Sequence, residues 1–170
     1  MIRDLTSDEI ECKVATVTEK GCQLLLYKTA RTDAKLLDET YGEMNWQCDY
    51  KEVKGNMYCT ISIWDENKKQ WISKQDCGIE SAFGDKEKGE ASDAFKRAGF
   101  KWGIGVELYN TPFIWIPAEK LKRISQKDNK WKCMDKFEVE AIHIENKKIT
   151  GLAIKNENGR CYLYNEKGGK

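Results

Sequence analysis

The chain has 170 residues, of which 40% are apolar and 34% charged, with 13 glycines and two prolines. This composition predicts one soluble domain of roughly 150 residues with short additions, and it excludes a second full domain. The 29 basic and 28 acidic residues leave a net charge of +1, so the overall charge gives no argument for a polyanionic partner. Positive charge nevertheless gathers in residues 118–170, which hold 13 basic and 8 acidic residues.

The seven cysteines are odd in number and contain no C-x-x-C pair. This pattern indicates reduced, mostly buried thiols and disfavours zinc or redox chemistry. The N-terminus is charged where a signal peptide needs an apolar segment, and the longest strongly apolar run, 22–27, is too short to span a membrane. We therefore expect a cytoplasmic protein that makes no membrane contact.

The first predicted elements are a short helix that begins after Thr6 and a β-hairpin. Residues 12–19 and 22–27 are rich in apolar and β-branched side chains and flank a glycine-containing turn, which predicts two paired strands. Apolar side chains then recur at helical spacing until Gly42, so we predict a helix over residues 30–41.

A three-stranded meander follows, with strands at 46–53, 57–65 and 70–78. Polar and apolar side chains alternate in its middle strand, which predicts one buried face. Helical spacing returns over 88–102, where one apolar stripe is formed by Ala91, Ala94, Phe95, Ala98 and Trp102. We expect this long helix to pack on the meander.

The rest of the chain predicts an extended segment at 111–117, a charged connection at 118–136 and a second meander with strands at 137–145, 148–155 and 160–164. The expected fold class is α+β: an antiparallel β-meander packed by a long helix (a β-β-β-α core) with a C-terminal β-meander.

The expected organisation follows from these elements. We predict a core domain at 1–117, the charged connection at 118–136, the C-terminal meander at 137–165 within the same globular unit, and a tail at 166–170.

Residue patterns that would support catalysis are weak. The single histidine, His143, lies in a predicted strand and is interpreted as a surface or strand-pairing residue. The acidic pairs Asp38-Glu39 and Asp65-Glu66 are adjacent in sequence, which disfavours a two-metal site. The Gly103-Ile104-Gly105 segment follows a helix instead of opening one, the wrong context for a phosphate-binding loop. We expect a protein that is not an enzyme and needs no cofactor or metal.

The long helix offers a candidate binding surface. Lys96 and Arg97 lie about 140° and 240° around the helix from Ala91, away from the apolar stripe, where a phosphate backbone could pass. Lys88 and Lys101 lie nearer the margins of the stripe. A solvated helix face with charge pairs is the alternative interpretation.

Phe100 is an apolar residue that lies outside the apolar stripe of this helix. It lies about 180° from the stripe, so we expect it to be exposed, packed on a neighbouring subunit or stacked on a base.

Several segments, in this order, are similar to a known family. They are Tyr27 to Gly42, Asn45-Trp46-Gln47, Trp71 to Gly78 and Glu87 to Tyr109. The last contains Ala-Phe-Lys-Arg-Ala and Trp-Gly-Ile-Gly-x-x-Leu-Tyr. Over roughly residues 5–117 the chain resembles the Rad-fifty-two superfamily of single-strand annealing proteins, and its short phage and prophage members in particular.

The resemblance implies a β-β-β-α core, assembly of many subunits into a ring or filament, and a positive groove that holds single-stranded DNA by its backbone. It implies no nucleotide cofactor. Family residues that contact DNA fall here on Arg31, Lys96 and Arg97. Looser secondary contacts fall on Lys88, Lys101, Lys68 and Lys69. One turn after the Lys-Arg pair, where eukaryotic members have a further basic residue, this chain has Phe100 beside Lys101.

The leading hypothesis is an ATP-independent single-stranded DNA-binding protein of phage or prophage origin that promotes annealing of complementary strands in homologous recombination and double-strand break repair. Its expected partners are single-stranded DNA and further copies of itself, with a single-strand-binding protein or an exonuclease as candidates. The alternative is a protein-interaction module that keeps the fold and binds a host protein. A metal-dependent nuclease is a third hypothesis, disfavoured because histidines and carboxylates are not clustered.

Overall fold

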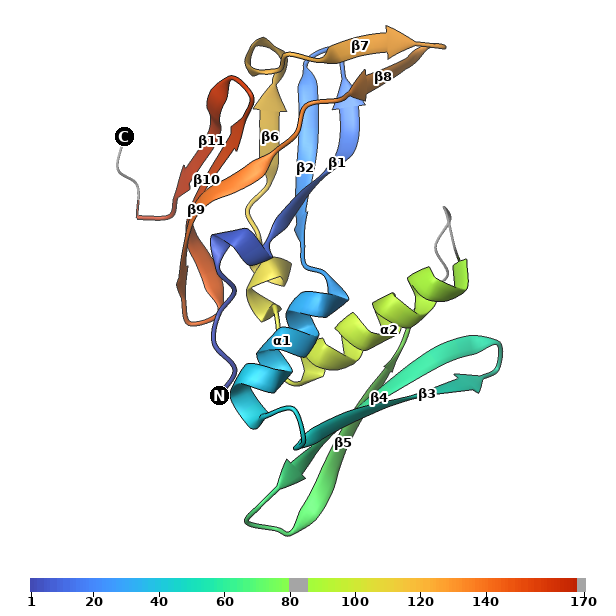
Figure 1. Cartoon of the computed structure of the whole chain (residues 1–170). Helices are drawn as coiled ribbons and strands as arrows, with labels where there is room; N and C mark the ends of the chain where they lie inside the picture. Colours follow the sequence, from blue (N-terminus) through green and yellow to red (C-terminus); the bar gives the residue numbers. More distant parts are fainter. Residues whose placement is uncertain (80–85, 168–170) are drawn as a thin grey trace. The chain divides into compact units, whose positions relative to one another are not determined.

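The computed structural model describes residues 1–79 and 86–167, and it has the predicted α+β architecture, built mainly from antiparallel strands (Figure 1). The helices are α1 (Ala30–Tyr41) and α2 (Lys86–Lys101), with short 3-10 helices η1 (Ser7–Glu9), η2 (Val106–Asn110) and η3 (Ala118–Lys120). The strands are β1 (Glu11–Thr18), β2 (Gly21–Tyr27), β3 (Trp46–Val53), β4 (Asn56–Asp65), β5 (Gln70–Cys77), β6 (Ile114–Pro117), β7 (Ile124–Lys127), β8 (Lys130–Cys133), β9 (Glu138–Glu145), β10 (Lys148–Asn156) and β11 (Gly159–Asn165).

These elements form two compact units, each built from two separate segments of the chain. The first unit comprises residues 1–3 and the described part of 29–105, and the second comprises residues 4–28 and the described part of 106–170. The N-terminal hairpin thus belongs to the unit of the C-terminal strands. The domain boundaries expected at 117 and 136 stay a prediction.

In the first unit, α2 packs on β4 and β5 of the antiparallel β3-β4-β5 sheet. The predicted stripe is confirmed at its centre, because Ala94, Phe95 and Ala98 are 0%, 5% and 0% exposed. The Phe95 ring lies 6.1 Å from the ring of Trp46 on β3. Hydrophobic burial between helix and sheet therefore fixes which sides of α2 stay open.

The start and end of α1 follow from local sequence. Thr29 precedes the helix, and its hydroxyl accepts a hydrogen bond from the Thr32 N–H at 3.3 Å, as an N-cap residue does. Gly42 ends the helix with φ +83°, and its N–H donates to the Asp38 carbonyl at 2.8 Å. A glycine adopts this backbone conformation without steric cost. The predicted range of 30–41 is confirmed.

A close backbone approach joins β5 to α2. A Cβ atom on Gly78, just after β5, would lie 2.2 Å from the Glu90 carbonyl oxygen of α2. On another side of α2, a Cβ on Gly99 would lie 2.7 Å from the buried Asp33 carboxyl of α1. Glycines at both positions thus let α2 lie close to β5 and to α1 (Figure 1).

The second unit is a six-stranded antiparallel sheet in the order β11-β10-β9-β1-β2-β6 (Figure 1). Its two edge strands approach each other, because the Tyr162 hydroxyl of β11 donates to the Phe113 carbonyl beside β6 at 3.1 Å. The core is lined by fully buried aliphatic side chains: Leu24, Ile114, Ile116, Ile149 and Ile154. The predicted N-terminal hairpin and C-terminal meander are confirmed.

Residues 118–136 hold a hairpin, β7–β8, that the sequence analysis does not predict. Its strands are four residues each and pair from Ile124↔Cys133 to Lys127↔Lys130. The turn residues Asp128 and Asn129 have φ +52° and +58°, which is typical of a type I′ turn. The charged composition of the segment concealed this turn signal.

Candidate nucleic-acid interface

Three of the predicted site residues lie together on the C-terminal half of α2, beside β5. The side chains of Lys96, Arg97 and Lys101 are 33%, 39% and 45% exposed. Arg97 and Lys101 are one helical turn apart, so their side chains leave the same face of α2. The structure thus brings these three cations together at the surface of the first unit.

One carboxylate of β5, Asp76, faces two of these cations. Its oxygens lie 3.7 Å from Arg97 Nε and 3.4 Å from Lys101 Nζ. Lys101 Nζ also donates to the Gln75 carbonyl at 2.6 Å. Arg97 Nε is buried and has no hydrogen-bond acceptor among the described residues, since 3.7 Å is too long for a hydrogen bond. Asp76 therefore satisfies the guanidinium incompletely.

Lys74 of β5 is a fourth cation here, which sequence reasoning missed. Its Nζ donates to the Lys101 carbonyl at 2.8 Å and lies 4.3 Å from the centre of the Trp102 ring. A lysine is favourable at this place because the C-terminus of a helix carries partial negative charge and an aromatic face attracts cations. Its only sequence signal is a lysine in a predicted strand, which is not distinctive.

These residues form what we call the α2–β5 cluster: Lys74, Asp76, Asp93, Lys96, Arg97, Lys101 and Trp102. Within it, Lys96 Nζ lies 3.9 Å from Asp93, one turn earlier on α2. Asp93 also accepts the Ile79 N–H at 3.1 Å. The cluster therefore holds four cations and two carboxylates, so it keeps a net positive charge.

Lys68 and Lys69 lie in the β4–β5 turn, away from this cluster. Lys68 Nζ is 3.6 Å from Asp65, and Lys69 is bonded to Glu66. The pKa of Asp65 lies below its ordinary value, mainly because the Lys68 N–H donates a hydrogen bond to this carboxylate. The pKa of Glu66 is also lowered, mainly by a hydrogen bond from Lys69 and then by one from Trp64. The turn is five residues from Lys74, roughly 16 Å along the strand, and Figure 1 shows it extending beyond the end of α2.

The structure does not bring Arg31 or Lys88 into the cluster either. Arg31 is exposed in the first turn of α1 and has no ion pair with any described residue. It lies about 200° around α1 from Asp33, which faces α2 at Gly99, so Arg31 points away from α2. Lys88 is exposed near the start of α2, roughly 12 Å along the helix from Lys96.

Phe100 is half-buried and takes part in a contact of the described chain. Full exposure, one of its three expected states, is therefore wrong. The helical wheel considered only the sheet side of α2, whereas α1 packs on another side, beside Gly99. Packing on a neighbouring subunit or a base stays a prediction for the exposed part of the ring.

Side chains that could support catalysis are dispersed. No three histidine, cysteine, aspartate or glutamate side chains in residues 1–79 and 86–167 are grouped to hold a metal ion. The exposed His143 has its Nδ1 2.8 Å from the Thr150 hydroxyl. All seven cysteines are free thiols. A side-chain hydrogen bond with Cys59 lowers the pKa of Cys48 to about 7, although burial opposes this shift.

Comparisons with family models, with curated proteins and with solved structures find no match to this chain. The resemblance to the Rad-fifty-two superfamily thus stays an expectation that rests on the segments quoted above. In the part of the chain that the structure describes, no helix has both the length and the apolar character required to cross a membrane.

Proposed function

We propose that this protein binds single-stranded DNA through the α2–β5 cluster and promotes annealing of complementary strands without ATP. The observation that carries the proposal is the gathering of Lys74, Lys96, Arg97 and Lys101 on α2 and β5 with two carboxylates, where Arg97 Nε has no acceptor among the described residues. An arginine that is only loosely paired is suited to a phosphate, which accepts two parallel N–H donors. The proposed activity is binding only, with no bond made or broken.

One small basic cluster binds DNA weakly, so tight binding requires many copies of the protein acting together. A few phosphate contacts give modest, salt-sensitive affinity. Joining many copies in a ring or filament raises the overall affinity without new contacts in each copy. We therefore include assembly of further copies of this chain in the proposal. A net charge of +1 is compatible with it when the basic residues line one path for the strand.

The first test is fluorescence anisotropy of a labelled single-stranded oligonucleotide and of the matched duplex, over a salt series without nucleotide or magnesium. We expect tighter, salt-dependent binding of the single strand. The variant Lys96→Ala/Arg97→Ala should keep its fold and bind at least about tenfold more weakly, because two phosphate contacts are lost. Wild-type protein that fails to bind at low salt would refute the function.

The β4–β5 turn offers a matched control for the site. Lys68→Ala/Lys69→Ala removes the same charge from the same unit, but both lysines are paired within their own turn. We expect it to bind like the wild type. Equal losses in the two variants would show that affinity follows overall charge and not the α2–β5 cluster. A strand-annealing assay with the same variants should rank them in the same order.

The protein-interaction module stays the second candidate, and one observation favours it. Phe113, beside the edge strand β6, is 69% exposed and stacks parallel to Trp115, with ring centres 6.4 Å apart. Tyr109 is also 68% exposed. Exposed aromatic side chains at a sheet edge are typical of protein contacts. If wild-type protein ignores DNA, Phe113→Ser is the variant with which to test this surface.

A further inference from the structure

The β7–β8 hairpin carries its lysines on one face. Side chains paired directly across antiparallel strands point to the same side, and the pairs are Ser125↔Lys132 and Lys127↔Lys130. The other face holds Ile124, Gln126, Trp131 and Cys133. Burial agrees, because the three lysines are exposed whereas Ile124, Trp131 and Cys133 are half-buried. We call Lys127, Lys130 and Lys132 the lysine face.

These lysines have no counter-charge in the described chain. None of the three side chains forms an ion pair or hydrogen bond with a described residue. Other basic residues of the same unit do form ion pairs, for example Lys155 with Glu138 at 3.2 Å and Arg160 with Glu140 at 2.6 Å.

Like charges directly across a strand pair destabilise it, and Lys127 lies opposite Lys130. The hairpin therefore holds unfavourable positive charge that an anion would relieve.

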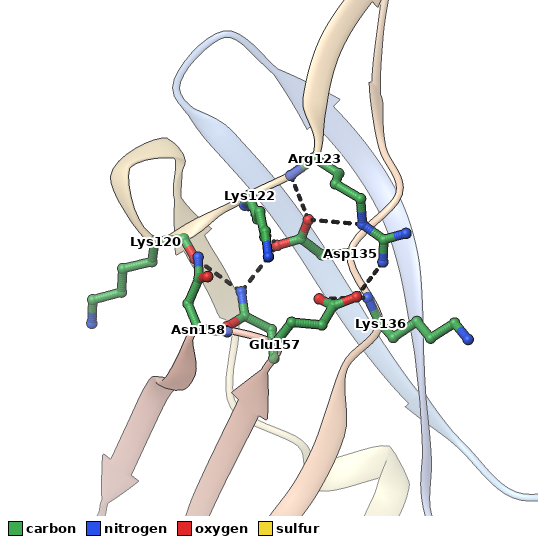
Figure 2. A network of polar contacts seen from close by, with 8 residues as sticks. Lys120, Lys122, Arg123, Asp135, Lys136, Glu157 and Asn158 are labelled. Atoms are coloured by element: carbon green, nitrogen blue, oxygen red, sulfur yellow. Dashed lines mark hydrogen bonds and ion pairs between the residues drawn. The ribbon is translucent and has the colours of Figure 1, made fainter.

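The base of the hairpin is held firmly by a buried carboxylate, shown in Figure 2. The side chain of Asp135 is fully buried and accepts the N–H of Lys122 at 2.9 Å, the N–H of Arg123 at 2.6 Å and the Asn156 amide at 3.0 Å. The Arg123 guanidinium lies 3.9 Å from Asp135 and also bonds Glu157 in the β10–β11 turn.

This network has two consequences for the lysine face. It ties the hairpin to the main sheet, so the cations are presented from an ordered support, which lowers the entropy cost of binding. It also occupies Asp135 and Glu157, so these acids do not neutralise the lysines. The turn residue Asp128 is exposed and forms no ion pair with a described residue.

We propose that the lysine face is a second phosphate-binding surface, which contacts the backbone of a single strand of nucleic acid in addition to the α2–β5 cluster. The identity of the ligand rests on the proposed function. Lys130 and Lys132 are two residues apart on one strand, about 7 Å, so they can address successive phosphates of an extended chain. Lysine acts as a flexible point charge, which suits binding without sequence preference.

The test is the variant Lys127→Gln/Lys130→Gln/Lys132→Gln, titrated against fluorescein-labelled oligo-deoxythymidine at several salt concentrations. Losing three phosphate contacts should reduce the slope of log affinity against log salt by about 2. The wild type should therefore lose roughly 20-fold more affinity than the variant between about 50 and about 200 mM salt. Circular dichroism should match that of the wild type, and the thermal midpoint should be slightly higher because the repulsion between residues 127 and 130 is removed.

Two matched variants control for net charge and for lysine size. Lys20→Gln/Lys51→Gln/Lys54→Gln removes three other exposed lysines that have no carboxylate partner in the described chain, and it should keep the wild-type slope. Lys127→Arg/Lys130→Arg/Lys132→Arg keeps the charge and should also keep the slope.

The outcomes separate this inference from the proposed function. If the wild type binds the oligonucleotide and the glutamine variant keeps the wild-type slope, the inference fails and the function stands. If the glutamine variant and the net-charge control lose slope equally, the lysine face has no special role, which also overturns the inference. Loss of binding to poly-glutamate, with oligonucleotide binding unchanged, would assign the face to an acidic protein instead. Wild-type protein that binds no oligonucleotide refutes both.

Discussion

The two basic surfaces differ in how their charge is balanced. In the α2–β5 cluster, Arg97 and Lys101 share Asp76, and Lys74 bonds a helix carbonyl. On the lysine face of β7–β8, the three lysines meet no described acid. Cations of the first kind also stabilise the fold and must release a carboxylate to bind phosphate. Cations of the second kind can bind phosphate without first breaking an ion pair. They therefore contribute mainly long-range attraction of the nucleic acid and the salt dependence of its binding.

The largest expected effect comes from removing the support of the lysine face. Asp135→Ala leaves two backbone N–H groups and the Asn156 amide without their buried acceptor. Losing such a buried charged acceptor costs about 3 kcal/mol of unfolding free energy. Chemical denaturation measures this loss, and hydrogen exchange should accelerate at the Lys122 and Arg123 amides. Glu119→Ala, an exposed carboxylate of the same unit, is the control and should change stability by less than about 0.5 kcal/mol.

The second largest effect is expected at the α2–β5 cluster. Gly78→Ala places a Cβ 2.2 Å from the Glu90 carbonyl oxygen, so the end of β5 and α2 must separate. We expect about 2 kcal/mol of destabilisation, with weaker DNA binding because Lys74 of β5 is displaced from the cations of α2. Thermal unfolding and anisotropy on one preparation measure both.

The control for this variant lies in the second unit. A Cβ on Gly151 would lie 3.2 Å from the side-chain atom His143 Cβ and 4.0 Å from the Tyr164 carbonyl oxygen, so Gly151→Ala should cost less. A Gly78→Ala protein as stable as the wild type would contradict the close packing of α2 on β5.

Local sequence signals were sufficient for most elements. The range of α1 follows from Thr29 and Gly42, and the packed side of α2 follows from Ala94, Phe95 and Ala98, because capping and helical spacing act over a few residues. The β3-β4-β5 meander likewise pairs neighbours in the chain.

The sequence did not reveal one short hairpin or the contacts between segments that lie far apart in the chain. The β7–β8 hairpin was concealed by its lysines, since charge counted against strands although the Asp128-Asn129 turn was present. Lys74 became part of the candidate site only through the ring of Trp102 and the end of α2. The pairing of Glu11 with Glu138 joins strands far apart in sequence, and no local pattern predicts such a partner.

A smaller effect tests whether Asp76 competes with phosphate. Asp76→Asn removes the carboxylate that Arg97 and Lys101 share. We expect single-stranded DNA to bind several-fold more tightly at low salt, about 1 kcal/mol, with little change in stability because the pairs are partly exposed. Anisotropy at low salt measures the gain.

Asp49→Asn is the matched control for this gain. Asp49 is an exposed carboxylate of the same unit that has no ion pair with a described residue. It changes the net charge equally and should bind DNA like the wild type. An equal gain in both variants would mean that Asp76 has no specific role.

The smallest expected effect distinguishes the two surfaces most directly, because stability and binding should move in opposite directions. Lys127→Glu replaces a like-charge pair with an opposite-charge pair across the hairpin, since residue 127 faces Lys130. The free energy of unfolding should rise by about 0.5 kcal/mol, which a higher thermal midpoint would show. DNA binding should weaken because the lysine face loses two units of positive charge. No such opposition is expected at Arg97, whose cation is already paired with Asp76: Arg97→Glu should lower both stability and binding. If Lys127→Glu lowers stability, the lysines of this hairpin are neutralised in the protein, and the difference between the surfaces disappears.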